Sequence, residues 1–137
     1  MIVADTNLLA YLLLGGTGTA AAEAVFLRDP VWTAPLLWRS EFRSVLAGNL
    51  RGRRLRLDDA IEAQQKAEAL LAGREHVVPS ERVLRLVASS TCSAYDCEFV
   101  ALASQLSALF VTSDRRVLKE FPAVAISPSR FAERSAP

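Results

Sequence analysis

The first thirteen residues, MIVADTNLLAYLL, constrain the fold more than any other stretch of the chain. A short apolar run ends at Asp5, Thr6 and Asn7, and apolar residues then resume at helical spacing. This pattern predicts a buried strand, a turn and a helix. In an open α/β sheet, ligands bind outside the carboxyl ends of the strands, so we expect Asp5 at the mouth of any site.

Composition limits the classes of protein to which the chain can belong. The 137 residues are 51% hydrophobic, which suits one domain spanning residues 1–137 that buries about 68% of its unfolded surface. No run approaches the roughly 20 apolar residues of a membrane span, and Asp5 and Asn7 interrupt the pattern of a signal peptide. We therefore expect a cytoplasmic protein without a membrane partner. The net charge of +1 is too small to indicate a nucleic-acid partner by itself.

Cysteine and histidine do not provide a metal site. Cys92 and Cys97 have neither zinc-ligand spacing nor enough companions for a disulfide framework, so we interpret both as packing residues. His76, the single histidine, lacks nitrogen or sulfur partners for zinc. Any metal site must therefore use oxygen ligands.

Apolar runs and helical periods alternate along the chain. Strands are expected at residues 1–4, 31–34, 76–78, 108–112 and 123–126. Helical segments lie between them, and the first is split by the loop GGTG. This alternation predicts an α/β fold: a Rossmann-like three-layer sandwich with a mainly parallel sheet flanked by helices. No glycine-rich nucleotide-binding motif follows the first strand.

Local signals also predict where individual helices begin and end. Pro35 suits the first position of a helix, because its missing N–H needs no partner there. Asp58 or Asp59 is expected to cap the next long helix, and Ser80 the one after it. The tail beyond Pro128 is expected to be a frayed end.

Four acids have positional reasons to converge. Asp5 and Asp114 follow strands, whereas Glu41 and Asp96 share helix faces with apolar residues. A salt bridge from Glu41 to Arg39 or Arg43 is one alternative. A first-turn position favoured by the helix dipole is the alternative for Asp96.

Close carboxylates repel one another, so such a group would have raised pKa values or would require a cation. Oxygen-only ligands favour Mg²⁺ or Mn²⁺, which activates water for displacement at phosphorus, and we predict phosphodiester hydrolysis. Glu98 is expected to point into solvent, with an indirect role left open. The polar neighbours that would orient the carboxylates, or act only as caps and turn residues, are Thr6, Asn7, Thr112 and Ser113.

The acids and their surroundings together resemble the PIN-domain family, in particular its VapC-type toxins. The matching segments are DTN at residues 5–7, WRSE at 38–41, YDCEFVALA at 95–103 and VTSD at 111–114. Their order and spacing cover nearly the whole chain. The glycine-containing loop at residues 15–19 and the arginine-rich connector at 51–56 are less typical of the family.

The resemblance implies a PIN-like fold and an Mg²⁺- or Mn²⁺-dependent endoribonuclease, the toxin of a type II toxin-antitoxin system. It implies that Asp5 and Asp96 are the principal metal ligands, that Glu41 and Asp114 complete the acidic pocket, and that Thr112 is the hydroxyl preceding the last acid. It further implies a homodimer inhibited by a cognate antitoxin, whose C-terminal segment covers the groove.

Arginine supplies nearly all of the positive charge. Setting aside the four pocket acids raises the formal net charge from +1 to +5. Arg39, Arg43 and Arg115 lie close in sequence to those acids, which suggests RNA contacts, although ordinary surface charge is the alternative for each.

Two other functions compete with the nuclease. One is a non-catalytic PIN-like module that binds RNA or a protein. The other is a phosphatase or phospho-acceptor of a related fold, which usually needs an acid two residues after the first, where this chain has Asn7.

Overall fold

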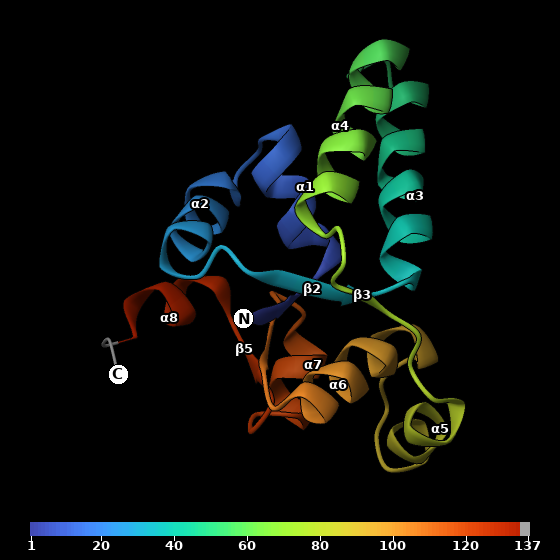
Figure 1. Ribbon diagram of the computed structural model, residues 1–137, viewed down its shortest axis with the longest axis vertical. Helices are drawn as coiled ribbons and strands as arrows, with labels where there is room; N and C mark the ends of the chain where they lie inside the picture. Colours follow the sequence, from blue (N-terminus) through green and yellow to red (C-terminus); the bar gives the residue numbers. More distant parts are fainter. Residues whose placement is uncertain (135–137) are drawn as a thin grey trace.

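The computed structural model describes residues 1–134, which form one parallel sheet between layers of helices (Figure 1). The sheet has the order β3-β2-β1-β4-β5, and every pairing is parallel. Its strands are β1 (Ile2–Ala4), β2 (Trp32–Pro35), β3 (Glu75–His76), β4 (Leu109–Val111) and β5 (Ala125–Ile126). The predicted three-layer α/β sandwich is thus confirmed.

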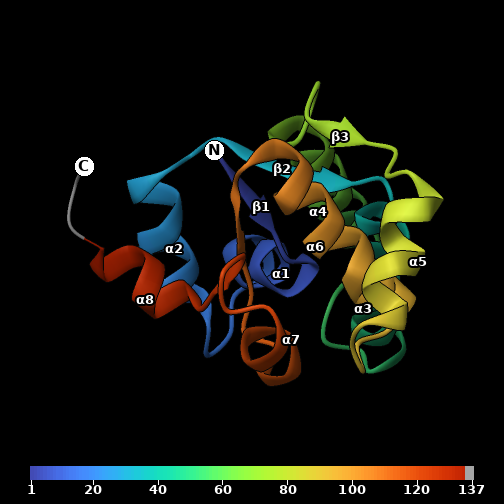
Figure 2. The same cartoon turned by 90° about the horizontal axis from the view of Figure 1, so that it is seen from below.

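The helices divide between the two faces of the sheet. They are α1 (Thr6–Leu14), α2 (Thr19–Arg28), α3 (Leu37–Arg51), α4 (Leu57–Leu70), α5 (Ser80–Ala88), α6 (Ala94–Leu106), α7 (Arg115–Glu120) and α8 (Pro128–Glu133). In Figure 1, α1 to α4 lie above the sheet and α5 to α7 below it, and α3 and α4 form a long pair that projects from the body. Figure 2 shows the molecule from the side of α5, α6 and α7.

Apolar strands and the inner faces of the helices form the core. All residues of β1 and β2 are buried, as expected for strands covered on both faces. On one face, α6 packs against β1, β2 and β4, and Phe99 stacks on Phe110 with ring centroids 5.3 Å apart. On the other face, Trp38 and Phe42 of α3 are fully buried. This packing on both faces holds the carboxyl ends of β1 and β4 in place, and the pocket described below lies at these ends.

The expected position of Pro35 is wrong. Pro35 ends β2 opposite His76, and α3 begins two residues later. The flanking amides make the hydrogen bonds instead: Ala34 donates to the Arg74 carbonyl, just before β3, at 3.2 Å, and Leu36 donates to the His76 carbonyl at 2.9 Å. The pairing of β2 with β3 therefore loses no hydrogen bond through the missing N–H of Pro35.

Two expected helix caps are also wrong. Arg56 precedes α4, and Asp58 and Asp59 lie inside its first turn, where the helix dipole also favours acids. Pro79 precedes α5, so Ser80 is a residue of the helix and makes no side-chain cap. Arg56 and Pro79 have extended backbone conformations and occupy the N-cap positions. Helices α4 and α5 therefore begin earlier than expected, at Leu57 and Ser80.

The expected frayed tail is a helix over most of its length. The Ser127 hydroxyl accepts a hydrogen bond from the Arg130 amide at 3.4 Å, and Pro128 begins α8. Phe131 is buried where α8 packs against α2, and the Arg28 guanidinium lies 5.7 Å from its ring centroid. This tertiary packing stabilises a helix too short to form alone. The expectation for residues 135–137 lies outside the described residues.

Within residues 1–134, no individual helix has both the length and the apolar character needed to cross a membrane. Only α1 and α2 taken together meet these criteria, and they are bent by 104° where they join.

Candidate active site

A pocket of about 530 Å³ opens at the carboxyl ends of β1 and β4. This is the edge of the sheet at which ligands bind in α/β folds, and polar residues dominate the pocket wall. The lining residues are Asp5, Thr6, Asn7, Glu41, Ser44, Val45, Asp96, Ser113 and Asp114. The structure therefore places all four predicted acids, from four separate segments, around one pocket.

Asp5 directly follows β1 and is held by Thr112, which directly follows β4. Thr112 is buried, with 1% of its surface exposed, and its hydroxyl donates to Asp5 Oδ2 at 2.5 Å. Burial raises the pKa of Asp5 above its ordinary value, and the charge of Asp96 adds to this effect. The Thr112 hydroxyl and the backbone amides of Asn7 and Thr6 partly oppose the rise. Asp5 is thus a strongly positioned carboxylate that is poorly compensated by positive charge.

Glu41 projects from α3 and is held by a threonine from α1. The Thr6 hydroxyl donates to Glu41 Oε1 at 2.8 Å. Burial raises the pKa of Glu41, and the charges of Asp5, Asp96 and Glu98 raise it further, while Thr6 opposes the rise. The structure gives Glu41 no salt bridge to Arg39 or Arg43 within residues 1–134. The salt-bridge alternative therefore does not account for its burial.

Asp96 and Asp114 reach the pocket from the starts of two helices. Asp96 lies in the first turn of α6, but the helix is capped by Ser93, whose hydroxyl accepts from the Asp96 amide at 3.1 Å. Asp114 itself caps α7, since its Oδ1 accepts from the Val117 amide at 3.0 Å. One oxygen of Asp114 therefore has a structural role, whereas the Asp96 carboxylate does not cap its helix.

Thr112 connects two of the acids. Its hydroxyl oxygen accepts a hydrogen bond from the Asp114 amide at 3.1 Å while the hydroxyl donates to Asp5. A fully formed chain of two hydrogen bonds thus couples the ends of β1 and β4. Ser113, which also lines the pocket, is exposed.

Two lining residues of the pocket are not among the predicted site residues, and a further acid, Glu98, acts on the site from outside its lining. Ser44 and Val45 line the pocket three and four residues after Glu41, and helical spacing alone would have identified them. Glu98 is partly buried, its pKa is raised by burial, and its charge acts on Glu41. The expectation that Glu98 points freely into solvent is wrong, because α3 brings Glu41 close to it. The periodicity of α6 cannot reveal that approach.

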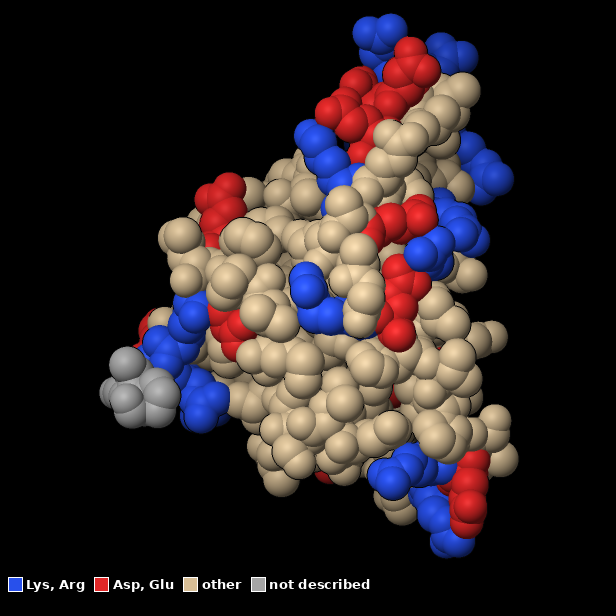
Figure 3. Space-filling model, in the orientation of Figure 1, with Lys and Arg blue, Asp and Glu red and all other residues tan. Residues whose placement is uncertain are grey.

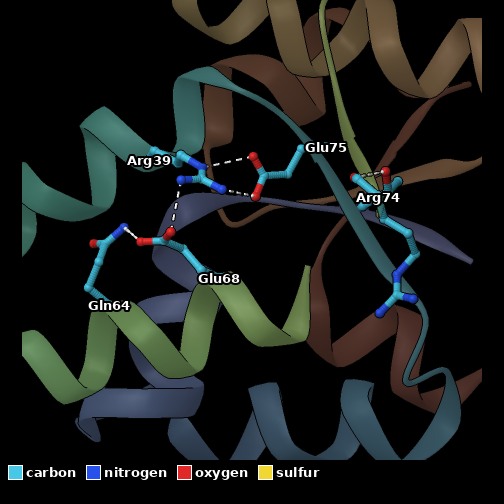
Figure 4. Close-up of polar contacts among 6 residues, drawn as sticks. Arg39, Gln64, Glu68, Arg74 and Glu75 are labelled. Atoms are coloured by element: carbon cyan, nitrogen blue, oxygen red, sulfur yellow. Dashed lines mark hydrogen bonds and ion pairs between the residues drawn. The ribbon is translucent and has the colours of Figure 1, made fainter. Parts of the chain in front are cut away.

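The predicted RNA-contacting arginines do not line the pocket. Arg43 and Arg115 are exposed. Arg39 binds Glu75 through two hydrogen bonds of 2.8 Å and Glu68 through a third of 2.8 Å (Figure 4). These ion pairs join α3 to β3 and α4.

Replacing Arg39 should therefore affect stability rather than RNA binding. Arg39→Ala leaves the Glu75 side chain, only 12% exposed, without its partner, so we expect a lower melting temperature. Circular dichroism on heating measures the change, and Arg43→Ala is the control, since Arg43 forms no ion pair within residues 1–134. A fall in RNA affinity at unchanged melting temperature would instead place Arg39 at the substrate.

The pocket offers the donor chemistry of a hard divalent cation. All four acids supply oxygen ligands, and a cation would offset the repulsion that contributes to the raised pKa values of Asp5 and Glu41. Among residues 1–134, no three His, Cys, Asp or Glu side chains are already grouped as a metal-binding set. The residues thus fit Mg²⁺ or Mn²⁺ in chemistry, and binding would have to draw their carboxylates together.

The raised pKa values predict how stability depends on pH. The folded state holds protons on Asp5 and Glu41 more tightly than the unfolded state, where their pKa values are near 3.8 and 4.5. The free energy of unfolding should therefore fall as pH rises from about 4 until both groups are ionised in the folded state. In EDTA, we expect the double variant Asp5→Asn/Glu41→Gln to gain melting temperature over the wild type as pH increases.

Adding Mn²⁺ should raise the wild-type melting temperature most above that pH window, since ionised carboxylates are the form that binds cations. Differential scanning calorimetry from about pH 4 to pH 8 covers the window. A difference in melting temperature between wild type and the double variant that stays constant from about pH 4 to pH 8 would contradict the raised pKa values of Asp5 and Glu41.

Comparison with known proteins agrees with this geometry. A family model for the PIN domain matches residues 2–124. A chain of a toxin-antitoxin complex from Klebsiella pneumoniae is similar in structure, with a TM-score of 0.70 and 16% identity over 93% of this chain and 98% of that one. The protein PAE2754 from Pyrobaculum aerophilum has a TM-score of 0.70 and 20% identity over 97% of both chains. None of the curated proteins compared with the sequence matches it. The two solved structures support the fold, and the family match over most of its length shows that the chain belongs to the PIN domain family.

Proposed function

We propose that the protein is a metal-dependent endoribonuclease, the toxin component of a type II toxin-antitoxin system. PIN domains are generally nucleases, which supports hydrolysis of a nucleic acid. The similarity to a chain from a toxin-antitoxin complex supports the biological setting. The observation that carries the proposal is that four acids, remote in sequence, line one pocket at the carboxyl edge of the sheet.

In this proposal Asp5 and Asp96 are the principal residues that hold Mg²⁺ or Mn²⁺, and Glu41 and Asp114 complete the site. The cation supplies charge neutralisation and activation of water for attack on an RNA phosphodiester. Thr112 and Thr6 position the Asp5 and Glu41 carboxylates through their hydroxyl hydrogen bonds. Asn7 and Ser113 supply further polar groups to the pocket wall.

The partners follow from the same proposal. A cognate antitoxin inhibits the enzyme by covering its groove, and the single domain of residues 1–137 acts in the cytoplasm as a homodimer. Light scattering at micromolar concentration tests the dimer directly, since a monomeric mass would contradict it.

Cleavage of a labelled single-stranded RNA tests the nuclease. We expect internal cuts with Mn²⁺ or Mg²⁺, none in EDTA, and a loss of cleavage in Asp96→Asn. Asp58→Asn, at an exposed acid on α4 outside the pocket, is the matched control and should cleave normally. RNA binding without cleavage in Mn²⁺ would overturn the proposal in favour of a non-catalytic module. Hydrolysis of a phosphomonoester without RNA cleavage would favour a phosphatase.

A further inference from the structure

The turn between α3 and α4 concentrates positive charge away from the acidic pocket. Four arginines occur there within six residues: Arg51, Arg53, Arg54 and Arg56. All four are exposed, and within residues 1–134 none forms a salt bridge with a carboxylate. Figure 3 shows Lys and Arg side chains at the free end of the projecting α3–α4 pair, with Asp and Glu side chains beside them on α4. We call residues 51–56 the arginine turn.

One face of α3 leads from the pocket to the arginine turn. Glu41 and Ser44 line the pocket, and Gly48 and Arg51 continue the same face at helical spacing. A side chain at Gly48 would meet nothing within 4 Å, so packing does not require glycine there, although glycine weakens a helix interior. Ser44 and Gly48 are exposed and small, so no large side chain obstructs the surface of α3 at these two positions. Ten residues at 1.5 Å each place Arg51 about 15 Å beyond Glu41.

The Arg54 guanidinium is held in place. Its Nε donates to Asn49 Oδ1 at 3.2 Å and its Nη2 to the Gly48 carbonyl at 3.4 Å. It lies so close to Gly52 that an added Cβ there would be 2.5 Å from Arg54 Nη1. Glycine at position 52 therefore leaves the space that this arrangement needs.

Arg53 occupies a backbone conformation that favours glycine. Its φ of 55° lies in the left-handed region, which side chains other than those of glycine, asparagine and aspartate rarely adopt. The chain thus places a long cationic side chain where a glycine would be less strained. Arg53, Arg54 and Arg56 line a hollow of about 330 Å³, with Asp59 the only acid among its lining residues.

We propose that the arginine turn binds backbone phosphates of RNA that extends from the pocket along α3. Guanidinium groups match phosphate in bidentate geometry, and these exposed arginines form no salt bridge within residues 1–134, with Arg54 held in place only by neutral oxygens of Asn49 and Gly48. The face of α3 is continuous with the pocket in which the proposed cleavage occurs, so this inference rests on that function. The substrate is therefore an RNA that reaches about 15 Å past the cleaved bond.

Binding measured without turnover tests the arginine turn independently of the nuclease. Fluorescence anisotropy of a labelled single-stranded RNA in EDTA should show about tenfold weaker affinity for Arg51→Gln/Arg53→Gln. The slope of log affinity against log salt should fall by about 1.4, since each phosphate contact on a single strand contributes roughly 0.7. Arg82→Gln/Arg85→Gln on α5, at the opposite end of the molecule in Figure 1, is the matched control and should bind like wild type.

Two single variants separate binding from folding. Arg53→Gly removes a charge while relieving the positive φ, so RNA affinity should fall while the melting temperature stays equal or rises. Gly52→Ala keeps every charge, but its added methyl group displaces the Arg54 guanidinium, so it should also weaken binding. Normal binding by both variants would overturn the role of this turn.

Substrate length gives the final test. In the Arg51→Gln/Arg53→Gln variant, KM for a long RNA should rise about tenfold at unchanged kcat, while cleavage of a dinucleotide stays unchanged. Equal RNA affinity of this variant and the α5 control would overturn the inference, and so would equally tight binding of polyglutamate. If the wild type binds RNA but does not cut it, the nuclease proposal fails, whereas the anisotropy result still decides whether the arginine turn holds phosphates.

Discussion

Asp5→Asn should reduce metal-dependent RNA cleavage by more than about 100-fold and leave the protein folded. Loss of groups that only orient metal ligands typically costs about 10- to 100-fold, so loss of a proposed principal ligand should cost more. Asparagine has nearly the same shape, and its amide oxygen can still accept the hydrogen bond from Thr112. The effect should therefore come from the lost charge rather than from altered packing.

Two measurements distinguish a catalytic effect from unfolding. Initial cleavage rates at several Mn²⁺ concentrations report the lost activity, and thermal denaturation in EDTA reports the fold. Burial raises the pKa of Asp5, so removing its ionisable group should maintain or increase the melting temperature at neutral pH. Wild-type cleavage rates in Asp5→Asn would remove the basis of the proposed mechanism, whatever the melting temperature.

Trp32→Ala should give the largest loss of stability, about 3–5 kcal/mol in the free energy of unfolding. Trp32 has no exposed surface, and its ring meets Phe26 edge-on at a centroid distance of 5.6 Å. The ring N–H also donates to the Asp29 carbonyl at 2.8 Å. Alanine would leave a cavity between β2 and α2 and remove this hydrogen bond together with the ring contact.

Urea denaturation followed by tryptophan fluorescence and circular dichroism measures this loss. Because native domains have total stabilities of about 5–15 kcal/mol, Trp32→Ala should be only marginally folded. Trp32→Phe keeps most of the ring volume but not the N–H donor, so it should cost clearly less. A destabilisation of Trp32→Ala below about 1 kcal/mol would mean that the surrounding core refills the space.

Local sequence patterns were sufficient for the layers of the fold and for the neighbourhood of the four acids. Strand ends and helix periods belong to a few consecutive residues, so the parallel sheet and the positions of Asp5 and Asp114 at its carboxyl edge could be anticipated. The same periods placed Glu41 and Asp96 toward the interior, where the structure has them lining the pocket.

Contacts between distant segments decided the rest. The position of Arg39 near Glu41 in the sequence suggested contact with a substrate. In the structure, α4 and β3 place Glu68 and Glu75 beside Arg39, and it forms ion pairs with both. The position of Glu98 on its helix suggested a solvated side chain. In the structure, α3 places Glu41 close enough for the charge of Glu98 to raise the pKa of Glu41. The C-terminal segment looked frayed, yet it forms α8 because Phe131 is buried at the contact with α2. Periodicity along one segment specifies which of its faces is apolar, but the partner of each polar side chain depends on which other segment the tertiary fold places beside it.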